Sequence, residues 1–140
     1  MTYEEWEADV PSDITRDTLW RIAAYRLSLF LADLARRDTA PLFKSRRTED
    51  IADQLLRATR KISACIAEGY SRDSGKSRSI YYEYALGSAR ESRDWYFKAR
   101  PELKPEVITH RLGLYSEIIR LSLAMISNER NRKRRPNPPG

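Results

Sequence analysis

Residues 51–69 read IADQLLRATRKISACIAEG, and their apolar or small side chains recur with a heptad period. The set comprises Ile51, Leu55, Ala58, Ile62, Cys65 and Gly69, at successive spacings of 4, 3, 4, 3 and 4 residues. Such a repeat places one stripe on one face of an α-helix and is typical of left-handed helix packing. The stretch therefore predicts a helix that follows a cap at Thr48 and packs inside a helical bundle.

Three further segments show helical spacing of apolar residues. They run from Asp13 or Thr15 to about Arg37, from about Ser77 to Arg100 and from about Pro105 to Asn131. Short links between helices favour antiparallel neighbours, so we predict an all-α fold, an antiparallel up-down-up-down four-helix bundle. Apolar residues cover more than half of the circumference of the first helix, which predicts burial on two sides and a homo-oligomer.

The composition excludes several classes of protein. The chain has 140 residues, enough for one domain with a hydrophobic core. Cys65 is its one cysteine and His110 its one histidine, which excludes a disulfide framework and the usual multi-Cys or multi-His metal sites. Neither an apolar run of membrane-spanning length nor a signal-peptide pattern is present. We expect a cytoplasmic protein with no cofactor, no metal ion and no membrane partner.

Catalytic signatures such as a Gly-rich phosphate loop or a nucleophile elbow are missing from the sequence, so we predict no catalytic residues and no enzyme. Glu68 lies among small apolar residues, and its expected partner is Arg72 at i+4 or the hydroxyl of Tyr81 or Tyr84. A small hydrolase that uses Glu68 or Glu91 is a third hypothesis about function. It is disfavoured because no second catalytic group accompanies either carboxylate.

The net charge of +6 is unevenly distributed along the chain. Residues 1–17 hold six acids and one base, a net charge of −5, whereas residues 130–140 hold five bases and no acid, a net charge of +5. The segment between them therefore carries +6 by itself. We divide the chain into an acidic N-terminal segment (1–13), a four-helix bundle (14–129) and a basic flexible tail (130–140).

Basic residues concentrate between Arg36 and Arg78, where eleven bases stand against six acids, and in the tail. Guanidinium groups bind phosphate oxygens well because they donate two parallel hydrogen bonds. We therefore predict a nucleic-acid interface formed by Arg46, Arg47, Arg57, Arg60, Lys61, Arg72, Lys76, Arg78, Arg132, Lys133, Arg134 and Arg135. The competing interpretation is a solvated charged face without a ligand.

Two motifs carry a family resemblance. Residues 66–72 read IAEGYSR, and residues 85–91 read ALGSARE. In this combination the chain resembles the helical-bundle proteins encoded in 23S ribosomal RNA intervening sequences, which are related to the accessory variability determinant of diversity-generating retroelements. The likeness covers residues 19–128. In the family an aromatic residue and an arginine often open the third helix, where this chain has Arg78, Ser79 and Ile80.

The resemblance implies a homopentamer with a positively charged surface. It also implies a structural role for the matched motif residues, which are Glu68, Gly69, Gly87, Ser88 and Glu91. The retroelement relatives act as accessory subunits that bind a reverse transcriptase and RNA. The leading hypothesis is therefore a non-enzymatic, oligomeric scaffold that binds nucleic acid, RNA above all, with a reverse transcriptase as a candidate partner. The alternative is a protein–protein interaction adaptor with no nucleic-acid ligand.

Overall fold

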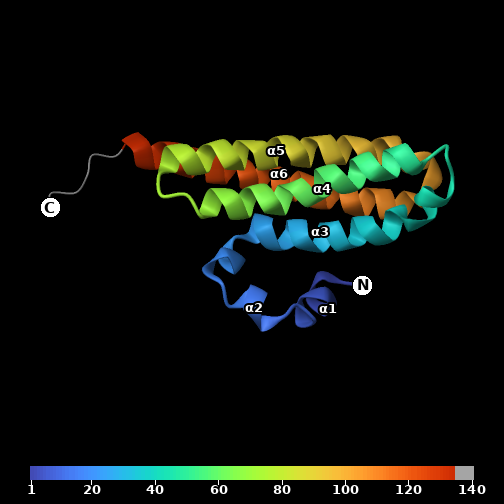
Figure 1. Ribbon diagram of the computed structural model, residues 1–140, viewed down its shortest axis with the longest axis horizontal. Coiled ribbons are helices and arrows are strands. Elements are labelled where there is room, and N and C mark those ends of the chain that lie inside the picture. The colour runs from blue at the N-terminus through green and yellow to red at the C-terminus, as the bar shows by residue number, and fades with distance from the viewer. Residues whose placement is uncertain (135–140) are drawn as a thin grey trace, which may run out of the picture.

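The computed structural model describes the backbone of residues 1–134 and the side chains of residues 1–132. All regular structure in this range is helical, as predicted, with six α-helices of which four are long. The elements are α1 (Tyr3–Ala8), α2 (Ser12–Thr15), η1 (Thr18–Arg21), α3 (Ala23–Thr39), η2 (Ala40–Lys44), α4 (Glu49–Tyr70), α5 (Gly75–Lys98), η3 (Arg100–Glu102) and α6 (Pro105–Arg134). The long helices α3 to α6 lie side by side, and α1 and α2 lie along α3 (Figure 1).

The four long helices run antiparallel to one another in chain order (Figure 1). Helix α3 packs against α4 and α6, α4 packs against α5, and α5 packs against α6. One end of the bundle, which we call the turn end, holds the short turn between α4 and α5 together with the last residues of α6. The opposite end, which we call the loop end, holds η2 and η3. This arrangement decides which basic residues are neighbours.

The first long helix starts later than the sequence predicted. The prediction was a start at Asp13 or Thr15, but α3 begins at Ala23. The carboxylate of Asp17 accepts a hydrogen bond from the backbone N–H of Leu19 at 2.9 Å and caps the short helix η1. Extended backbone at Ile22 then separates η1 from α3. Aspartate favours such local caps over a continuous helix. The predicted domain boundary at residue 14 falls inside the separate short helix α2.

The C-terminal region also differs from the prediction of a flexible tail from residue 130. Helix α6 continues to Arg134, so residues 130–134 are helical. Arg130 forms an ion pair with Glu83 of α5, which fixes the last turns of α6 against its neighbour. The remainder of the predicted tail, residues 135–140, lies outside the described residues.

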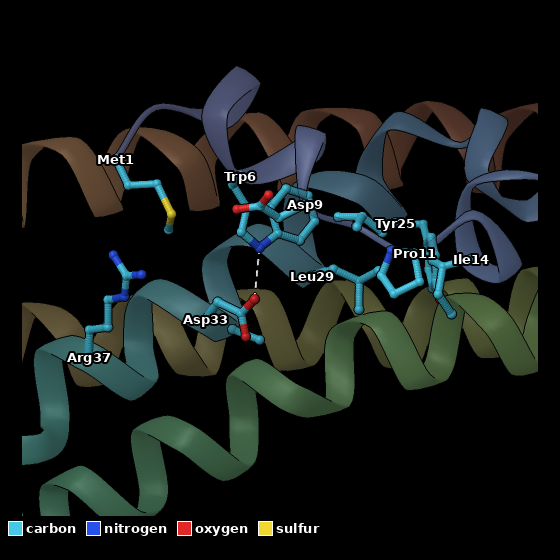
Figure 2. A pocket seen from close by; sticks show the side chains of 11 residues that line it. Met1, Trp6, Asp9, Pro11, Ile14, Tyr25, Leu29, Asp33 and Arg37 are labelled. Atoms are coloured by element: carbon cyan, nitrogen blue, oxygen red, sulfur yellow. Dashed lines mark hydrogen bonds between the residues drawn. The ribbon is translucent and has the colours of Figure 1, made fainter.

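The acidic N-terminal segment is folded onto α3. Trp6 of α1 is buried, with 8% of its surface exposed, and its indole N–H donates to the carboxylate of Asp33 at 2.7 Å. Its ring packs 5.4 Å from Phe30, between ring centroids. Figure 2 shows the groove of about 470 Å³ that remains between this segment and α3, with Trp6 and Asp33 on its wall. Aromatic packing therefore attaches the segment to the bundle despite its charge.

Helix α4 buries a wider face than its heptad alone predicted. Leu55 and Ile62 are fully buried, as the repeat requires, but Ile66 is fully buried as well. Ile51 and Cys65 are half-buried, so the centre of the core-facing side is rotated away from the predicted stripe. Burial raises the pKa of the Cys65 thiol, which disfavours the reactive thiolate.

The bundle core contains a polar network that the sequence did not reveal. Arg111 of α6 donates two hydrogen bonds to the carboxylate of Asp38 in α3, at 2.7 and 3.0 Å. The hydroxyl of fully buried Tyr96 in α5 donates to the same carboxylate at 2.7 Å. Because burial raises the pKa of Tyr96, this hydroxyl stays protonated and remains a donor. The network ties α3 to α5 and α6 through partners 58 and 73 positions further along the chain.

Helices α4 and α5 approach each other closely at Gly69. A Cβ atom at this position would lie 2.9 Å from Cβ of Tyr81 and 2.9 Å from the ring of Tyr82. Nothing lies within 4 Å of a Cβ atom built at Gly87, on the exposed side of α5, so packing inside the subunit does not explain the second motif glycine. The two glycines therefore form a matched pair for mutagenesis.

We expect Gly69→Ala to destabilise the protein by about 1–3 kcal/mol, because the added methyl group forces two packed helices apart. Gly87→Ala should instead stabilise it by up to about 1 kcal/mol, because alanine favours a helix interior and meets no neighbour. Urea unfolding followed by circular dichroism measures both changes. Equal effects of the two substitutions would contradict the assigned close approach.

Candidate nucleic-acid interface

The predicted basic residues occupy three separate places on the bundle rather than one patch. Arg46 and Arg47 lie at the loop end, whereas Arg57, Arg60 and Lys61 lie on the exposed side of α4. A third group lies at the turn end and comprises Arg72, Lys76, Arg78 and Arg132. Since the 22 residues of α4 span about 33 Å, the first and third groups are separated by nearly the length of the bundle.

The last predicted residues are only partly described. Lys133 and Arg134 belong to α6, but their side chains lie outside the described residues, as does the whole of Arg135. Their contribution to an interface therefore stays a prediction.

Arg78 is committed to a structural ion pair, which corrects its predicted role. Its Nε lies 3.0 Å from the Glu129 carboxylate, and the two side chains are only 18% and 10% exposed. Its guanidinium also donates to the backbone carbonyl of Arg72 at 2.9 Å. Gly75 makes room for this pair, because a Cβ atom there would lie 3.0 Å from the carbonyl oxygen of Glu129. A guanidinium held in this way joins α5 to α6 and is not available to a phosphate.

Arg72 has two partners of its own. One amino group of its guanidinium donates to Glu68 and to the hydroxyl of Tyr81, both at 2.7 Å. The i+4 partner expected for Glu68 is therefore present, and the tyrosine joins through the arginine. Since Arg72 is 41% and Glu68 54% exposed, this pair lies at the surface and remains accessible from solvent.

Five predicted residues keep their charge exposed. Arg46, Arg47, Arg60, Lys61 and Lys76 are exposed, and within the described part of the chain none has a carboxylate within 4.0 Å. Arg57 pairs with Asp53 at 3.2 Å but is 74% exposed, and such surface pairs are weak. Arg132 is 67% exposed and has only a longer contact of 3.7 Å with Glu129. These seven side chains are the ones that can meet phosphate groups directly.

The structure adds basic residues at the loop end that the sequence prediction left out. They are Arg36, Arg37, Lys44, Arg100 and Lys104, and all five are exposed. They come from the end of α3, from η2, from η3 and from the start of α6, which antiparallel packing brings to the end that carries Arg46 and Arg47. Glu49 and Glu102 are exposed at the same end, so the basic excess there is partial.

The motif carboxylates have ordinary surface partners. Glu68 pairs with Arg72, and exposed Glu91 accepts a hydrogen bond from the indole N–H of Trp95 at 3.2 Å. Residues 1–132 contain no group of three His, Cys, Asp or Glu side chains able to hold a metal ion. Over the described helices, none combines the length and apolarity needed to cross a bilayer.

The comparisons identify the family. Residues 22–128 match the family model described as "23S rRNA-intervening sequence protein", and the chain belongs to this family. A crystal structure from Bacteroides thetaiotaomicron, described as a protein of unknown function from the S23 ribosomal protein family, has a similar fold with a TM-score of 0.68. The two chains are 23% identical over 74% of this chain and 98% of the other. No curated protein sequence matches.

We expect Arg78→Met to destabilise the protein by about 2 kcal/mol, because it leaves the nearly buried Glu129 carboxylate with only the longer contact of 3.7 Å to Arg132. The matched control is Arg57→Met, which breaks an exposed pair and should change the free energy of unfolding by no more than about 0.5 kcal/mol. Chemical denaturation of both variants tests this difference. If Arg78→Met is as stable as the control, the guanidinium is free for another role and our correction is wrong.

Proposed function

We propose that this member of the 23S rRNA-intervening sequence protein family is a non-enzymatic, oligomeric scaffold that binds RNA. The observation that carries the proposal is the group of exposed basic side chains without carboxylate partners in the described chain, above all Arg46, Arg47, Arg60 and Lys61. Such groups release counterions when they meet phosphates, which is the main source of affinity for a nucleic-acid backbone.

The distribution of charge supports this proposal better than the total does. Two guanidinium groups are largely screened from solvent and join helices, in the pairs Arg78–Glu129 and Arg111–Asp38. The arginines that project from α4 and the loop end are not needed to hold the fold. Like charges that remain at the surface repel one another, and this repulsion destabilises the fold. A polyanionic partner would reduce the repulsion.

The state of the carboxylates favours a binding role over hydrolysis. Glu68 and Glu91, the two candidates for acid–base chemistry, are exposed and bind Arg72 and Trp95. A general acid or base works best when burial or a neighbouring charge tunes its pKa toward neutrality. An exposed carboxylate beside an arginine lacks such an environment, which supports a structural role for both residues.

We also propose that the chain assembles with itself, as a pentamer in keeping with its resemblance. Support comes from apolar side chains on the outer sides of α5 and α6, where Ile80 is 40% and Leu123 46% exposed. Five chains of charge +6 would carry +30, which strengthens the attraction of RNA through multivalent contact.

The resemblance suggests a reverse transcriptase as the partner enzyme, and we propose that the scaffold binds one in addition to RNA. The same exposed apolar side chains equally suit an interaction adaptor without RNA. Co-purification of a tagged chain with a reverse transcriptase encoded beside it, before and after ribonuclease treatment, separates a protein-mediated association from one that RNA bridges.

The test of RNA binding is its dependence on salt. We expect the full chain to bind single-stranded RNA with an affinity that falls as salt rises. The triple variant Arg46→Gln, Arg47→Gln, Arg60→Gln should reduce the slope of log K against log salt by about 2, since each lost phosphate contact removes about 0.7. Fluorescence anisotropy with a labelled oligonucleotide measures the slope.

The control replaces Arg16, which follows α2, and Arg21, which ends η1. Arg16→Gln with Arg21→Gln removes exposed charge next to carboxylates such as Asp17 and should leave the slope within about 0.3 of the parent value. An unchanged slope in the triple variant, or no RNA binding at low salt, would overturn the proposal and favour the adaptor.

A further inference from the structure

Helix α5 presents a line of aromatic and small residues on its outer side, next to α4. The line consists of Tyr81, Tyr84, Ser88, Glu91 and Trp95, at successive spacings of 3, 4, 3 and 4 residues, and we call it the aromatic stripe. This spacing keeps all five on one face of the helix. Tyr84 is 57% exposed, the largest exposure among the large hydrophobic side chains of the described residues. Tyr81 and Trp95 are half-buried.

The rings of the aromatic stripe are held in place by their neighbours. Tyr81 and Tyr84 pack edge to face, with ring centroids 5.7 Å apart and an interplanar angle of 87°. The Arg72 guanidinium lies over the Tyr81 ring, 4.7 Å from its centroid. Its hydrogen bond to the Tyr81 hydroxyl restrains both side chains further. The Lys98 ammonium lies 4.6 Å from the centroid of the Trp95 ring. Pre-positioned rings lose little entropy when a planar ligand stacks on them.

Helix α4 places cations along the same seam. Its contact with α5 is fixed at the turn end by Arg72 and Tyr81. Because the two helices are antiparallel, moving along the seam from this contact brings Lys61 and then Arg57 level with the half of α5 that carries Trp95. Both side chains are exposed. Aromatic rings therefore lie close to positive charges at both ends of the seam, with Ser88 and Glu91 between them.

The charges along this seam are balanced, which separates it from the basic groups described above. Each of its cations except Lys61 has a carboxylate partner, in the pairs Arg57–Asp53, Arg72–Glu68 and Lys98–Asp94. Glu91 is engaged by the Trp95 indole. The seam differs from the rest of the surface by its exposed aromatic rings next to polar groups. It does not carry an excess of positive charge.

We propose that the aromatic stripe is a stacking site for unpaired bases of single-stranded RNA, with Tyr84 as its most accessible ring. The inference rests on the proposed RNA-binding function. It specifies that the aromatic stripe contacts the bases of the RNA rather than its phosphates. Aromatic side chains stack on bases of any sequence, and single-stranded segments are the ones whose bases are free to do so. Bases on the stripe leave the phosphates of the same strand close to Lys61 and Arg60, on the neighbouring exposed side of α4.

The test compares three variants of the full chain. Tyr84→Leu removes the ring but keeps an apolar side chain, Tyr84→Phe keeps the ring, and Phe97→Leu is the control. Phe97 is also an exposed α5 aromatic, at 49%, with an arginine over its ring, but it lies on the side of α5 next to α6. The probes are a labelled oligoadenylate of about 12 nucleotides and an RNA duplex of equal length.

We expect Tyr84→Leu to weaken oligoadenylate binding about tenfold without changing its salt dependence, because it removes a stacking contact and no charge. Duplex binding should stay at the parent value, and Tyr84→Phe and Phe97→Leu should bind both probes like the parent. Parent-like oligoadenylate binding by Tyr84→Leu, or an equal loss for the duplex, would overturn the stacking site while leaving the proposed function intact. Failure of the parent to bind either RNA would overturn both.

Two further readouts complete the test. Stacking on Trp95 should quench its emission on addition of oligoadenylate. Trp95→Phe should abolish most of that quenching, since the other two tryptophans, Trp6 and Trp20, lie in α1 and η1, away from the stripe. Light scattering of Tyr84→Leu should show the mass of the parent assembly. A changed mass would identify Tyr84 as a subunit contact and overturn its role as a stacking site.

Discussion

The contact at Gly69 sets the relation of α4 to α5, and other features of the bundle depend on it. The backbone of α4 comes close enough there to touch Tyr81 and Tyr82. This contact fixes how far one helix is shifted along the other. The shift in turn places Arg72 over the Tyr81 ring and brings the exposed cations of α4 next to the outer side of α5. A larger residue at 69 would change all of these positions together.

Ion pairing inside the bundle decides which basic residues remain for a ligand. Sequence composition treats all arginines alike, but Arg78 and Arg111 are used to join helices through Glu129 and Asp38. Desolvating a guanidinium is costly, so one that is nearly buried is bound to its partner and does not exchange it for a phosphate. Arg46, Arg47 and Arg60 have no such role and keep their charge in solvent. The proposed RNA-binding surface therefore consists of the basic side chains that are not used in ion pairs between helices.

The sequence predicted local features better than distant ones. The heptad of residues 51–69 and the i+4 pair of Glu68 with Arg72 depend on neighbours in one helix, and both are present in the structure. The partners Arg78 and Glu129 are 51 positions apart, so no local spacing could reveal that this arginine is buried. The late start of α3 depends on a cap at Asp17 that competes with a continuous helix, and apolar periodicity cannot detect such a competition.

We propose above all that RNA lies along the loop end with Arg46 and Arg47, the exposed side of α4 and the adjoining outer side of α5. Photo-crosslinking of the full chain to 4-thiouridine-substituted RNA, followed by peptide mapping, tests it most directly. The account predicts crosslinked peptides that contain Tyr84 or Trp95, or the basic residues 57–61. Crosslinks confined to the acidic N-terminal segment, or none above the level of a non-binding protein, would contradict it.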